Sequence, residues 1–332
     1  MMKNKTIVKI DLNDKRYGGR IYENEIVNCL SDQFNFKRVF LLKYKCKIFN
    51  LVRIIGLYLY YRYFFKGYLM LTNHTTWMAG CRSKNLVIVH HIDTSTSRGL
   101  SGLFQKLCDK ALTYNINRYH YIITVSSYWK NILLNLGFSN PIVIYNSFDP
   151  SLYTFTADEI NDFKNRFDLN GKPIIYLGNS QRQKGVVESY SSLKELNCYF
   201  VTSGIKDVEL PVKHLDLDFR DYRILLNASN VVICMSKLIE GWNRTAHEAM
   251  LSGTPVIGSG TGGMRELLDI GEGYICKDFS DLRLLVKDVF AKNIKPNSNN
   301  LSKYNIAYFV NSWSQVLDAF VNSKDLESTS LL

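Results

Sequence analysis

Residues 240–258 read EGWNRTAHEAMLSGTPVIG, and this stretch decides how the rest of the chain is interpreted. It follows an apolar, strand-like run at Val231–Cys234. Asn243 is a good N-cap, and Gly253 with Pro255 just beyond it is typical of a helix end. The pattern therefore predicts a buried strand followed by a helix that runs from about Asn243 to Gly253.

The start of this helix has the chemistry of a phosphate site. Unpaired backbone N–H groups and the positive end of the helix dipole fall at residues 241–245. The candidate residues of this phosphate site are Gly241, Trp242, Asn243, Arg244 and Thr245. Glu240 precedes the cap, and Glu248 lies a turn or more inside the helix. We therefore expect one carboxylate to reach a sugar and the other to reach ribose hydroxyls.

Short β-branched and aromatic runs alternate with longer helical patterns, which is typical of parallel α/β architecture. In the first half, strands are expected at Thr6–Ile10, Arg38–Leu42, Tyr68–Leu71, Leu86–Val89, Tyr121–Val125 and Ile142–Ile144. In the second half, they are expected at Pro173–Leu177, Tyr199–Thr202, Val231–Cys234, Pro255–Ile257 and Gly273–Cys276. Because 332 residues exceed the needs of one core, we expect two domains, 1–150 and 151–305, and a C-terminal helix and tail, 306–332.

Composition indicates a globular protein, with 46% hydrophobic and 21% charged residues. Its seven cysteines are scattered singly, without the paired spacing of a zinc or redox motif. We therefore expect a reduced, cytoplasmic protein without a structural metal. The N-terminus lacks the pattern of a signal peptide. The apolar run Phe49–Phe65 is interrupted by Arg53 and Arg62 and is short for a bilayer span.

Charge is distributed unevenly along the chain. Residues 1–150 hold 21 Lys and Arg against 8 Asp and Glu, whereas residues 151–332 hold 20 against 22. A positive field of this kind attracts phosphates, whether on nucleic acid, on anionic lipid or on an anionic substrate. The alternative is that these lysines merely solubilise the surface.

Residues 240–258 belong to a wider pattern that continues to Glu266. After Glu248 come an Ala-Met pair, a Gly-Thr-Pro-Val-Ile turn, and then Gly262, Gly263 and Glu266. Together with Glu240, these residues resemble the donor-site signature of family 4 retaining glycosyltransferases (glycosyl transferases group 1), which have the GT-B fold. The resemblance implies an α/β protein with two Rossmann-like domains facing an interdomain cleft. It also implies a C-terminal helix that crosses back to the first domain.

Landmarks in other parts of the chain extend the resemblance. Gly18 and Gly19, after the first expected strand, are similar to the family's N-terminal glycine loop, where backbone approaches the donor. His91 ends an apolar strand within His90–Asp93, as the family's His-Asp element does. Trp313, near the C-terminus, resembles part of the family's closing helix.

The segment Tyr176–Gly185 is similar to the family's phosphate-binding strand and loop. Gly178 and Lys184 keep the family's positions. The family usually has an arginine directly after that first glycine, but this chain has Asn179. Arg182 is the candidate substitute for the missing guanidinium.

The resemblance implies hexosyl transfer from a nucleotide-sugar co-substrate, UDP- or GDP-sugar, with retention of configuration and without a bound cofactor. The absence of paired aspartates in the sequence indicates a metal-independent reaction. Breaking the sugar–phosphate bond builds negative charge on the diphosphate, so preorganised cations such as Lys184 would contribute the catalysis. Glu240 is expected to hold the sugar, Glu248 the ribose, and His91 the sugar or the acceptor, a glycan or lipid-linked molecule.

Three other interpretations compete with this one. The segment Gly258–Gly263 matches a dinucleotide-binding glycine fingerprint, but Met264–Ile270 is too short for the crossover helix of such a unit. A non-catalytic glycan-binding or scaffolding relative would keep the same pattern without turnover. Nucleic-acid binding through the basic half gives the glutamates and glycines no role, so no nucleic-acid partner is expected.

An aromatic and basic segment raises the question of membrane binding. Its basic residues are Lys37, Arg38, Lys43, Lys45, Lys47 and Arg53, and Tyr58–Tyr68 adds seven tyrosines and phenylalanines. Such a composition suits an anionic membrane surface, where the protein would be peripheral at the cytoplasmic face. The alternative is that Phe49–Lys66 is a helix with its aromatics buried against the first domain's sheet. Both alternatives remain open from the sequence.

Overall fold

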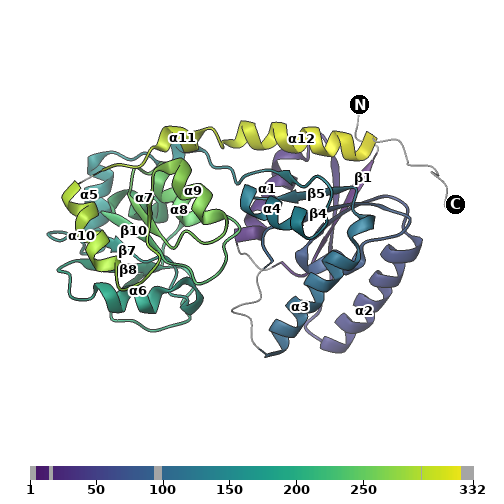
Figure 1. Cartoon of the computed structure of the whole chain (residues 1–332), viewed down its shortest axis with the longest axis horizontal. Helices are drawn as coiled ribbons and strands as arrows, with labels where there is room; N and C mark the ends of the chain where they lie inside the picture. Colours follow the sequence, from purple (N-terminus) through teal and green to yellow (C-terminus); the bar gives the residue numbers. More distant parts are fainter. Residues whose placement is uncertain (1–4, 15–17, 93–98, 293, 323–332) are drawn as a thin grey trace. The chain divides into compact units, whose positions relative to one another are not determined.

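The computed structural model describes residues 5–14, 18–92, 99–292 and 294–322 (Figure 1). These residues pack as two compact units. The described residues within 1–125, 130–145 and 307–332 form the first unit, and those within 126–129 and 146–306 form the second. Each unit is built around its own six-stranded parallel sheet.

The sheet of the first unit has the strand order β2-β1-β3-β4-β5-β6. Its strands are β1 (Thr6–Asp11), β2 (Asn35–Phe40), β3 (Tyr68–Thr72), β4 (Lys84–Val89), β5 (Tyr121–Thr124) and β6 (Ile142–Val143). The central strands are buried along almost their whole length, as expected for a parallel sheet covered on both faces. Since every pairing is parallel, the carboxyl ends of these strands meet at one edge.

The helices of the first unit cover this sheet. They are α1 (Gly18–Leu30), α2 (Lys47–Leu59), α3 (Gly99–Tyr114) and α4 (Ser127–Asn135), with short turns η1 (Tyr60–Phe64), η2 (Asn73–Met78) and η3 (Ile116–Arg118). The last helix, α12 (Ile306–Asn322), also packs on this unit (Figure 1). Trp313 Nε1 donates to the Tyr22 hydroxyl over 3.2 Å, and the Phe320 ring meets that of Tyr68 edge to face at 5.4 Å. The predicted return of the C-terminal helix to the first domain is confirmed.

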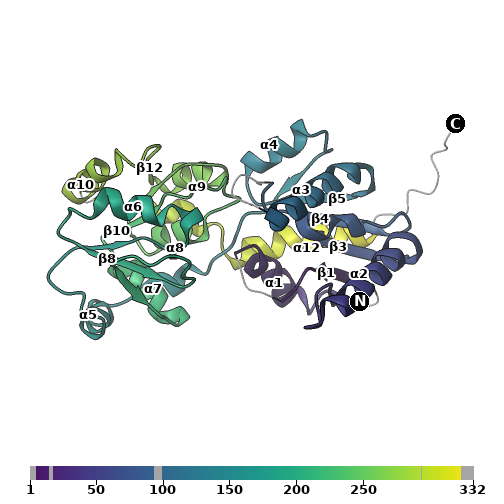
Figure 2. The same ribbon diagram turned by 90° about the horizontal axis from the view of Figure 1, so that it is seen from below.

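The sheet of the second unit has the order β12-β11-β10-β7-β8-β9. Its strands are β7 (Ile174–Tyr176), β8 (Tyr199–Ser203), β9 (Lys213–Leu215), β10 (Val231–Cys234), β11 (Val256–Gly258) and β12 (Tyr274–Ile275). The remaining elements are η4 (Pro150–Tyr153), α5 (Ala157–Arg166), η5 (Arg182–Lys184), α6 (Val186–Leu193), α7 (Phe219–Ala228), α8 (Arg244–Leu251), α9 (Gly263–Gly271), α10 (Leu282–Lys292) and α11 (Ser298–Ser302). Helices α6 and α10 pack together on one face, and α7, α8 and α9 pack on the other (Figure 2).

The structure differs from the expected strands mainly at their ends. Strand β2 begins at Asn35 rather than Arg38, where the Asn35 amide donates to the Thr6 hydroxyl over 2.8 Å. The sequence analysis missed β9, since Lys213–Leu215 is three residues long and shows no alternation. Phe49–Phe65 is divided between α2 and the π-helical turn η1. Within the described residues, no helix is long and apolar enough to cross a bilayer.

Candidate active site

Glu240 lies in the second unit, on the segment that joins β10 to α8. Its backbone oxygen accepts from Gly263 N–H over 2.8 Å and from Trp129 Nε1 over 3.0 Å. Glu240 also forms an isolated parallel bridge with Gly262, and the residue is 8% exposed. A fixed backbone therefore holds this carboxylate in place.

Two glycines let a neighbouring loop pass close to Glu240. Gly262 has φ of +62°, a conformation that side chains disfavour. A Cβ at Gly262 would collide with the Glu240 carbonyl oxygen, and a Cβ at Gly263 would collide with that of Gly241. The Gly-Gly pair of the sequence pattern is therefore required by close backbone packing against the Glu240 segment. Glu266, one turn later, accepts from Ser127 N–H over 2.8 Å.

Lys184 forms an ion pair with Glu240, with Nζ 2.7 Å from Oε1. The lysine ends the turn η5, and Gly185 follows in a left-handed conformation with φ of +70°. A Cβ at Gly185 would collide with the carbonyl oxygen of Met235, so glycine allows η5 to approach the end of β10. The side chains of Lys184 and Glu240 are 31% and 10% exposed, so solvent reaches the pair. The structure thus brings together the predicted phosphate-binding lysine and the predicted sugar-binding carboxylate.

Helix α8 begins where the sequence predicts. Asn243 is its N-cap, and the side-chain oxygen accepts from Ala246 N–H over 2.9 Å. The Trp242 side chain is buried, and its Nε1 donates to His247 Nδ1 over 3.1 Å. Any contact of Trp242 with a ligand must therefore use its backbone. Thr245, the second residue of α8, is half-buried.

Arg244 is held within the second unit rather than extended into solvent. Its Nη1 donates to Asn146 Oδ1 over 3.0 Å, and the guanidinium carbon lies 4.3 Å from the centre of the Phe148 ring. A guanidinium stacked in this way keeps its charge at a fixed position beside α8.

Both carboxylate oxygens of Glu248 accept hydrogen bonds from tyrosines. Tyr153 donates to Oε1 over 3.1 Å, and Tyr222 donates to Oε2 over 2.8 Å. Glu248 is 5% exposed. Burial raises its pKa, and the charge of Arg244 and the two tyrosine hydroxyls offset that effect only in part. The sequence analysis missed both tyrosines because they lie far from Glu248 along the chain.

The loop after β7 carries the other predicted donor residues. Gly178 has φ of +75°, a left-handed backbone conformation that explains why a glycine stands at this position. Asn179 packs beside Gly204, where an added Cβ would lie 2.8 Å from its side-chain oxygen. Arg182 is exposed on η5, two residues before Lys184. The loop therefore places Arg182 and Lys184 on the same short turn.

A pocket of about 420 Å³ opens at the carboxyl ends of β10 and β11. Its lining consists of Met235, Ser236, Lys237, Ser259, Gly260, Thr261, Lys277 and Phe279. None of these was predicted as a site residue. Within the part of the chain that the structure describes, no group of three or more His, Cys, Asp or Glu side chains could hold a metal ion.

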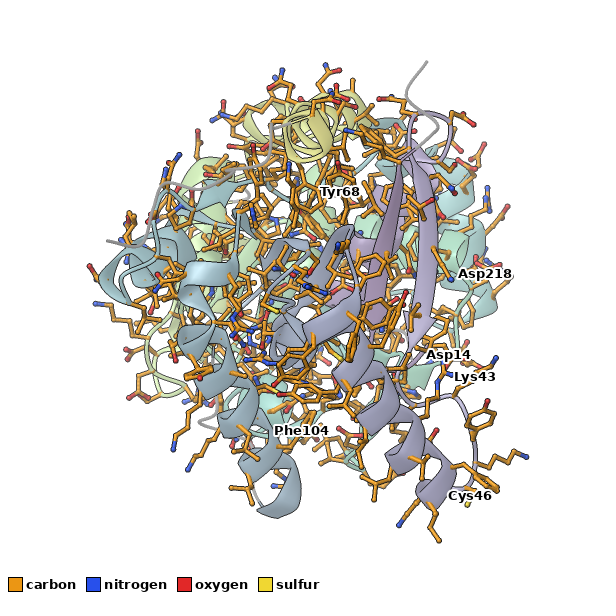
Figure 3. The ribbon with its side chains drawn as sticks, turned by 90° about the vertical axis from the view of Figure 1, so that its right-hand side faces the viewer. Asp14, Lys43, Cys46, Tyr68, Phe104 and Asp218 are labelled. Carbon is orange, nitrogen blue, oxygen red and sulfur yellow. The ribbon has the colours of Figure 1, made fainter. Side chains whose placement is uncertain are left out.

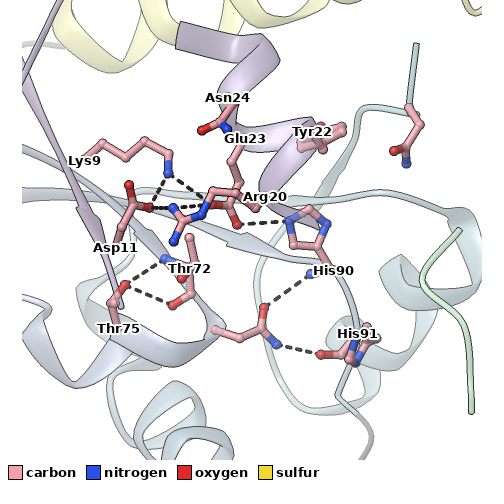
Figure 4. Close-up of polar contacts among 12 residues, drawn as sticks. Lys9, Asp11, Arg20, Tyr22, Glu23, Asn24, Thr72, Thr75, His90 and His91 are labelled. Carbon is pink, nitrogen blue, oxygen red and sulfur yellow. Dashed lines mark hydrogen bonds and ion pairs between the residues drawn. The ribbon is translucent and has the colours of Figure 1, made fainter. Parts of the chain in front are cut away.

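The first unit contains a buried ionic cluster that the sequence analysis missed (Figure 4). Lys9 pairs with Asp11, and its Nζ lies 3.0 Å from Glu23 Oε2. Arg20 pairs with the same two carboxylates. These four residues are at most 2% exposed. Burial by itself would raise the pKa of Glu23, but Lys9, His90 and Arg20 outweigh it and lower the pKa to about 2.

The predicted first-domain residues lie around this cluster. Gly18 and Gly19 are the first two residues of α1 rather than part of a loop. His90 Nε2 lies 3.2 Å from Glu23 Oε1, and the half-buried His91 accepts at its backbone oxygen from the Asn73 amide over 2.6 Å (Figure 4). Asp93, quoted with these histidines, falls outside the described residues.

One protein family matches part of the chain. Residues 157–306 match the family model described as "Glycosyl transferases group 1". No curated protein matches the sequence significantly.

Solved structures of glycosyltransferases resemble the whole chain. HepE of Anabaena, solved with UDP-glucose, has 15% sequence identity and a TM-score of 0.75, over 95% of this chain and 99% of HepE. Sucrose-phosphate synthase from Thermosynechococcus elongatus has 14% identity and a TM-score of 0.76, and the match covers 97% of this chain and 100% of the synthase. The catalytic domain of starch synthase IV from Arabidopsis thaliana, bound to ADP and acarbose, has 13% identity and a TM-score of 0.64, over 97% and 99%. The two Rossmann-like domains are therefore those of the GT-B fold, as predicted.

Proposed function

We propose that this chain, whose residues 157–306 form a glycosyl transferases group 1 domain, transfers a sugar from a nucleotide diphosphate sugar to an acceptor. The observation that carries the proposal is the ion pair between Lys184 and Glu240, 2.7 Å apart and partly open to solvent. One partner suits a phosphate and the other suits sugar hydroxyls. A donor at this position would need both.

In the proposed reaction, the bond between the anomeric carbon and the diphosphate oxygen breaks, and the nucleotide diphosphate leaves with the bonding electrons. An acceptor hydroxyl oxygen bonds to the anomeric carbon, and its proton passes to the leaving diphosphate. Lys184 would move from Glu240 to the developing negative charge on the diphosphate. The Glu240 carboxylate, released from the ammonium, would then accept hydrogen bonds from the sugar. A cation aimed at the leaving oxygen stabilises the transition state more than the ground state.

Glu248 is proposed to hold the ribose of the donor. A carboxylate oxygen has two lone pairs, so each Glu248 oxygen keeps one acceptor position besides its tyrosine bond. Retention of configuration, a metal-independent reaction, a hexosyl group and a UDP- or GDP-sugar donor belong to the same proposal. The acceptor is proposed to be a glycan, free or lipid-linked. All seven cysteines are free, which supports a reducing, cytoplasmic location.

A second candidate is a non-catalytic relative that binds a glycan or nucleotide. Asn179 in place of the arginine of the resembled loop favours it, as do the two tyrosines already bonded to Glu248. Donor turnover separates the two candidates.

The experiment is a panel of UDP-, GDP- and ADP-sugars, read first by thermal shift and then by release of the free nucleotide diphosphate. The proposal expects one nucleotide class to stabilise the protein and to be hydrolysed slowly without acceptor. Stabilisation without any release, with acceptor glycans present, would support the non-catalytic candidate. If no member of the panel stabilises the protein, the proposed donor class is wrong.

A further inference from the structure

Helix α2 exposes an apolar stripe on the first unit. Ile48, Val52, Ile55 and Leu59 follow one another at spacings of four, three and four residues, which places them on one face of a helix. Their exposed fractions are 71%, 64%, 50% and 47%. Phe49 and Leu51 flank the stripe and are 66% and 58% exposed. An exposed apolar surface of this extent marks an interaction site.

The opposite face of α2 packs against the core of the first unit. Ile54, Leu57 and Tyr58 are half-buried and pack against the core of the first unit. This face attaches the helix to the sheet, so core packing does not explain the stripe. The sequence left an interfacial and a core role for Phe49–Lys66 as alternatives, and in the structure α2 has one face packed on the core and one face exposed.

Helix α3 of the same unit also exposes apolar side chains. Figures 1 and 3 show α3 beside α2, with Cys46 and Phe104 labelled near the outer ends of the two helices. Leu103, Phe104 and Leu107 of α3 are 57%, 38% and 56% exposed. Tyr114 at the end of α3 is 78% exposed.

The charged residues that precede and follow α2 along the chain are all of one sign. Residues 33–92 contain ten Lys and Arg and no Asp or Glu, whereas the average of the chain would place about five acidic residues there. A protein partner of such a surface would need a complementary negative patch. An uninterrupted basic environment around apolar side chains is instead complementary to an anionic lipid surface.

A fixed loop presents three of these lysines next to α2. Lys43, Lys45 and Lys47 are exposed at and just before the start of the helix. Asn50, the buried residue of α2, accepts from the backbone N–H groups of Lys43 and Tyr44 over 3.1 and 2.9 Å. Its amide also donates to the Tyr44 backbone oxygen over 2.7 Å. The lysines are thus held beside the apolar stripe.

We propose that the α2 surface, the stripe Ile48, Val52, Ile55 and Leu59 with Lys43, Lys45 and Lys47 at its edge, docks onto an anionic lipid bilayer. Helix α2 has 13 residues and would be about 20 Å long at 1.5 Å per residue, too short to span the hydrocarbon core. It therefore lies in the plane of the interface. The stripe enters the lipid, and the lysines meet the headgroups. This inference does not depend on the proposed transferase activity.

The test is co-sedimentation of the full chain with vesicles of phosphatidylcholine alone and with a third of phosphatidylglycerol added. We expect binding only to the anionic vesicles, weakened at high salt. Changing Lys43, Lys45 and Lys47 together to Glu should weaken it about a hundredfold or more, since each lysine near the surface contributes roughly fivefold. Changing Ile48, Val52 and Ile55 together to Ser should abolish it.

A matched control carries the same change of charge on the second unit. Lys194, Lys287 and Lys295 are exposed there, and changing all three to Glu should leave vesicle binding within about twofold of the parent. Equal losses in both triple variants would mean that net charge alone drives binding, which overturns the proposed surface. No binding to anionic vesicles would also overturn it. So would a dimer in light scattering that the Ser variant dissociates, because a second copy would then cover the stripe.

Donor hydrolysis in the absence of vesicles keeps the two proposals separate. The Glu variant at Lys43, Lys45 and Lys47 should hydrolyse the donor like the parent chain, since these lysines lie outside the candidate site. A chain that binds vesicles but never turns over a donor would disprove the transferase proposal and leave the surface intact.

Discussion

Tyr222 donates a hydrogen bond of 2.8 Å to Glu248, and this bond ties helix α7 to helix α8 at the carboxylate proposed to hold the donor's ribose. Because Glu248 is buried and its pKa is raised, its charged form depends on this hydroxyl. The pH at which donor affinity falls on acidification should therefore depend on Tyr222.

Tyr222→Phe should move the loss of donor affinity to higher pH. The ionised carboxylate binds the ribose, so affinity falls as pH drops through the pKa of Glu248, and removing a donor to the carboxylate raises that pKa further. Donor Kd measured from pH 4 to 8 by calorimetry tests the shift. Tyr190→Phe, a change on α6, is the control and should keep the parent profile. An unshifted profile in Tyr222→Phe would show that Glu248 does not limit binding.

Glu248→Gln and Glu240→Gln should have different kinetic effects. Glu248→Gln should raise the donor KM about tenfold or more, because charge-assisted hydrogen bonds to ribose contribute about 1.5 to 3 kcal/mol each. Glu240→Gln should act mainly on kcat. Initial rates at varied donor concentration measure both. If both variants fold and transfer sugar as fast as the parent chain, Glu240 and Glu248 are not part of the active site.

Lys184→Ala should lower kcat by about a hundredfold or more, as loss of one preorganised transition-state stabiliser does in other enzymes. Asn179→Ala, on the same loop, is the matched comparison and should cost much less. Single-turnover rates with saturating donor test this prediction. If Asn179→Ala costs as much as Lys184→Ala, the roles along Tyr176–Gly185 have been misassigned.

Glu23 should make the first unit sensitive to acid. Its pKa is lowered to about 2 from an ordinary value of 4.5, so its ion pairs stabilise the fold fully above pH 4.5. That stability is lost as pH falls towards 2. Glu23→Gln should cost about 3 kcal/mol or more at pH 7, because it removes one of the two buried carboxylates that pair with Lys9 and Arg20. Glu209→Gln, whose side chain is 83% exposed, should change the free energy of unfolding by less than about 0.5 kcal/mol in urea titrations.

Gly262→Ala should lower both stability and donor turnover, because the new Cβ would collide with the Glu240 carbonyl oxygen in a backbone of positive φ. Gly56→Ala on α2 is the opposite case. A Cβ there meets nothing within 4 Å, so this substitution should stabilise the helix by about 0.5 to 1 kcal/mol. Thermal denaturation compares them. A stable, active Gly262→Ala variant would mean that the loop can move away from Glu240.

Local signals in the sequence predicted much of this architecture. The cap at Asn243 and the apolar run before it predicted β10 and α8, because both depend on short stretches of chain. The same is true of Lys184 on its glycine-bounded turn. Contacts between residues that are distant in the sequence could not be predicted. The pairing of Glu248 with Tyr153 joins residues 95 positions apart, and no periodicity links them.

The buried cluster of the first unit shows the same limit. Lys9 sits in a strand that reads as mostly apolar, and nothing in Thr6–Asp11 announces a charged core. The cluster forms because α1 returns Arg20 and Glu23 over the end of that strand. Sequence patterns predict which elements form, whereas charge pairing in the interior depends on how they are packed.

The return of α12 to the first unit has a consequence for how the protein is made. The first unit is completed by residues that leave the ribosome only after the whole of residues 146–306. Until then Tyr22 and Tyr68 lack Trp313 and Phe320 as their cover. The second unit is nearly continuous in sequence and can fold first. Part of the apolar surface of the first unit therefore stays uncovered during synthesis until α12 emerges.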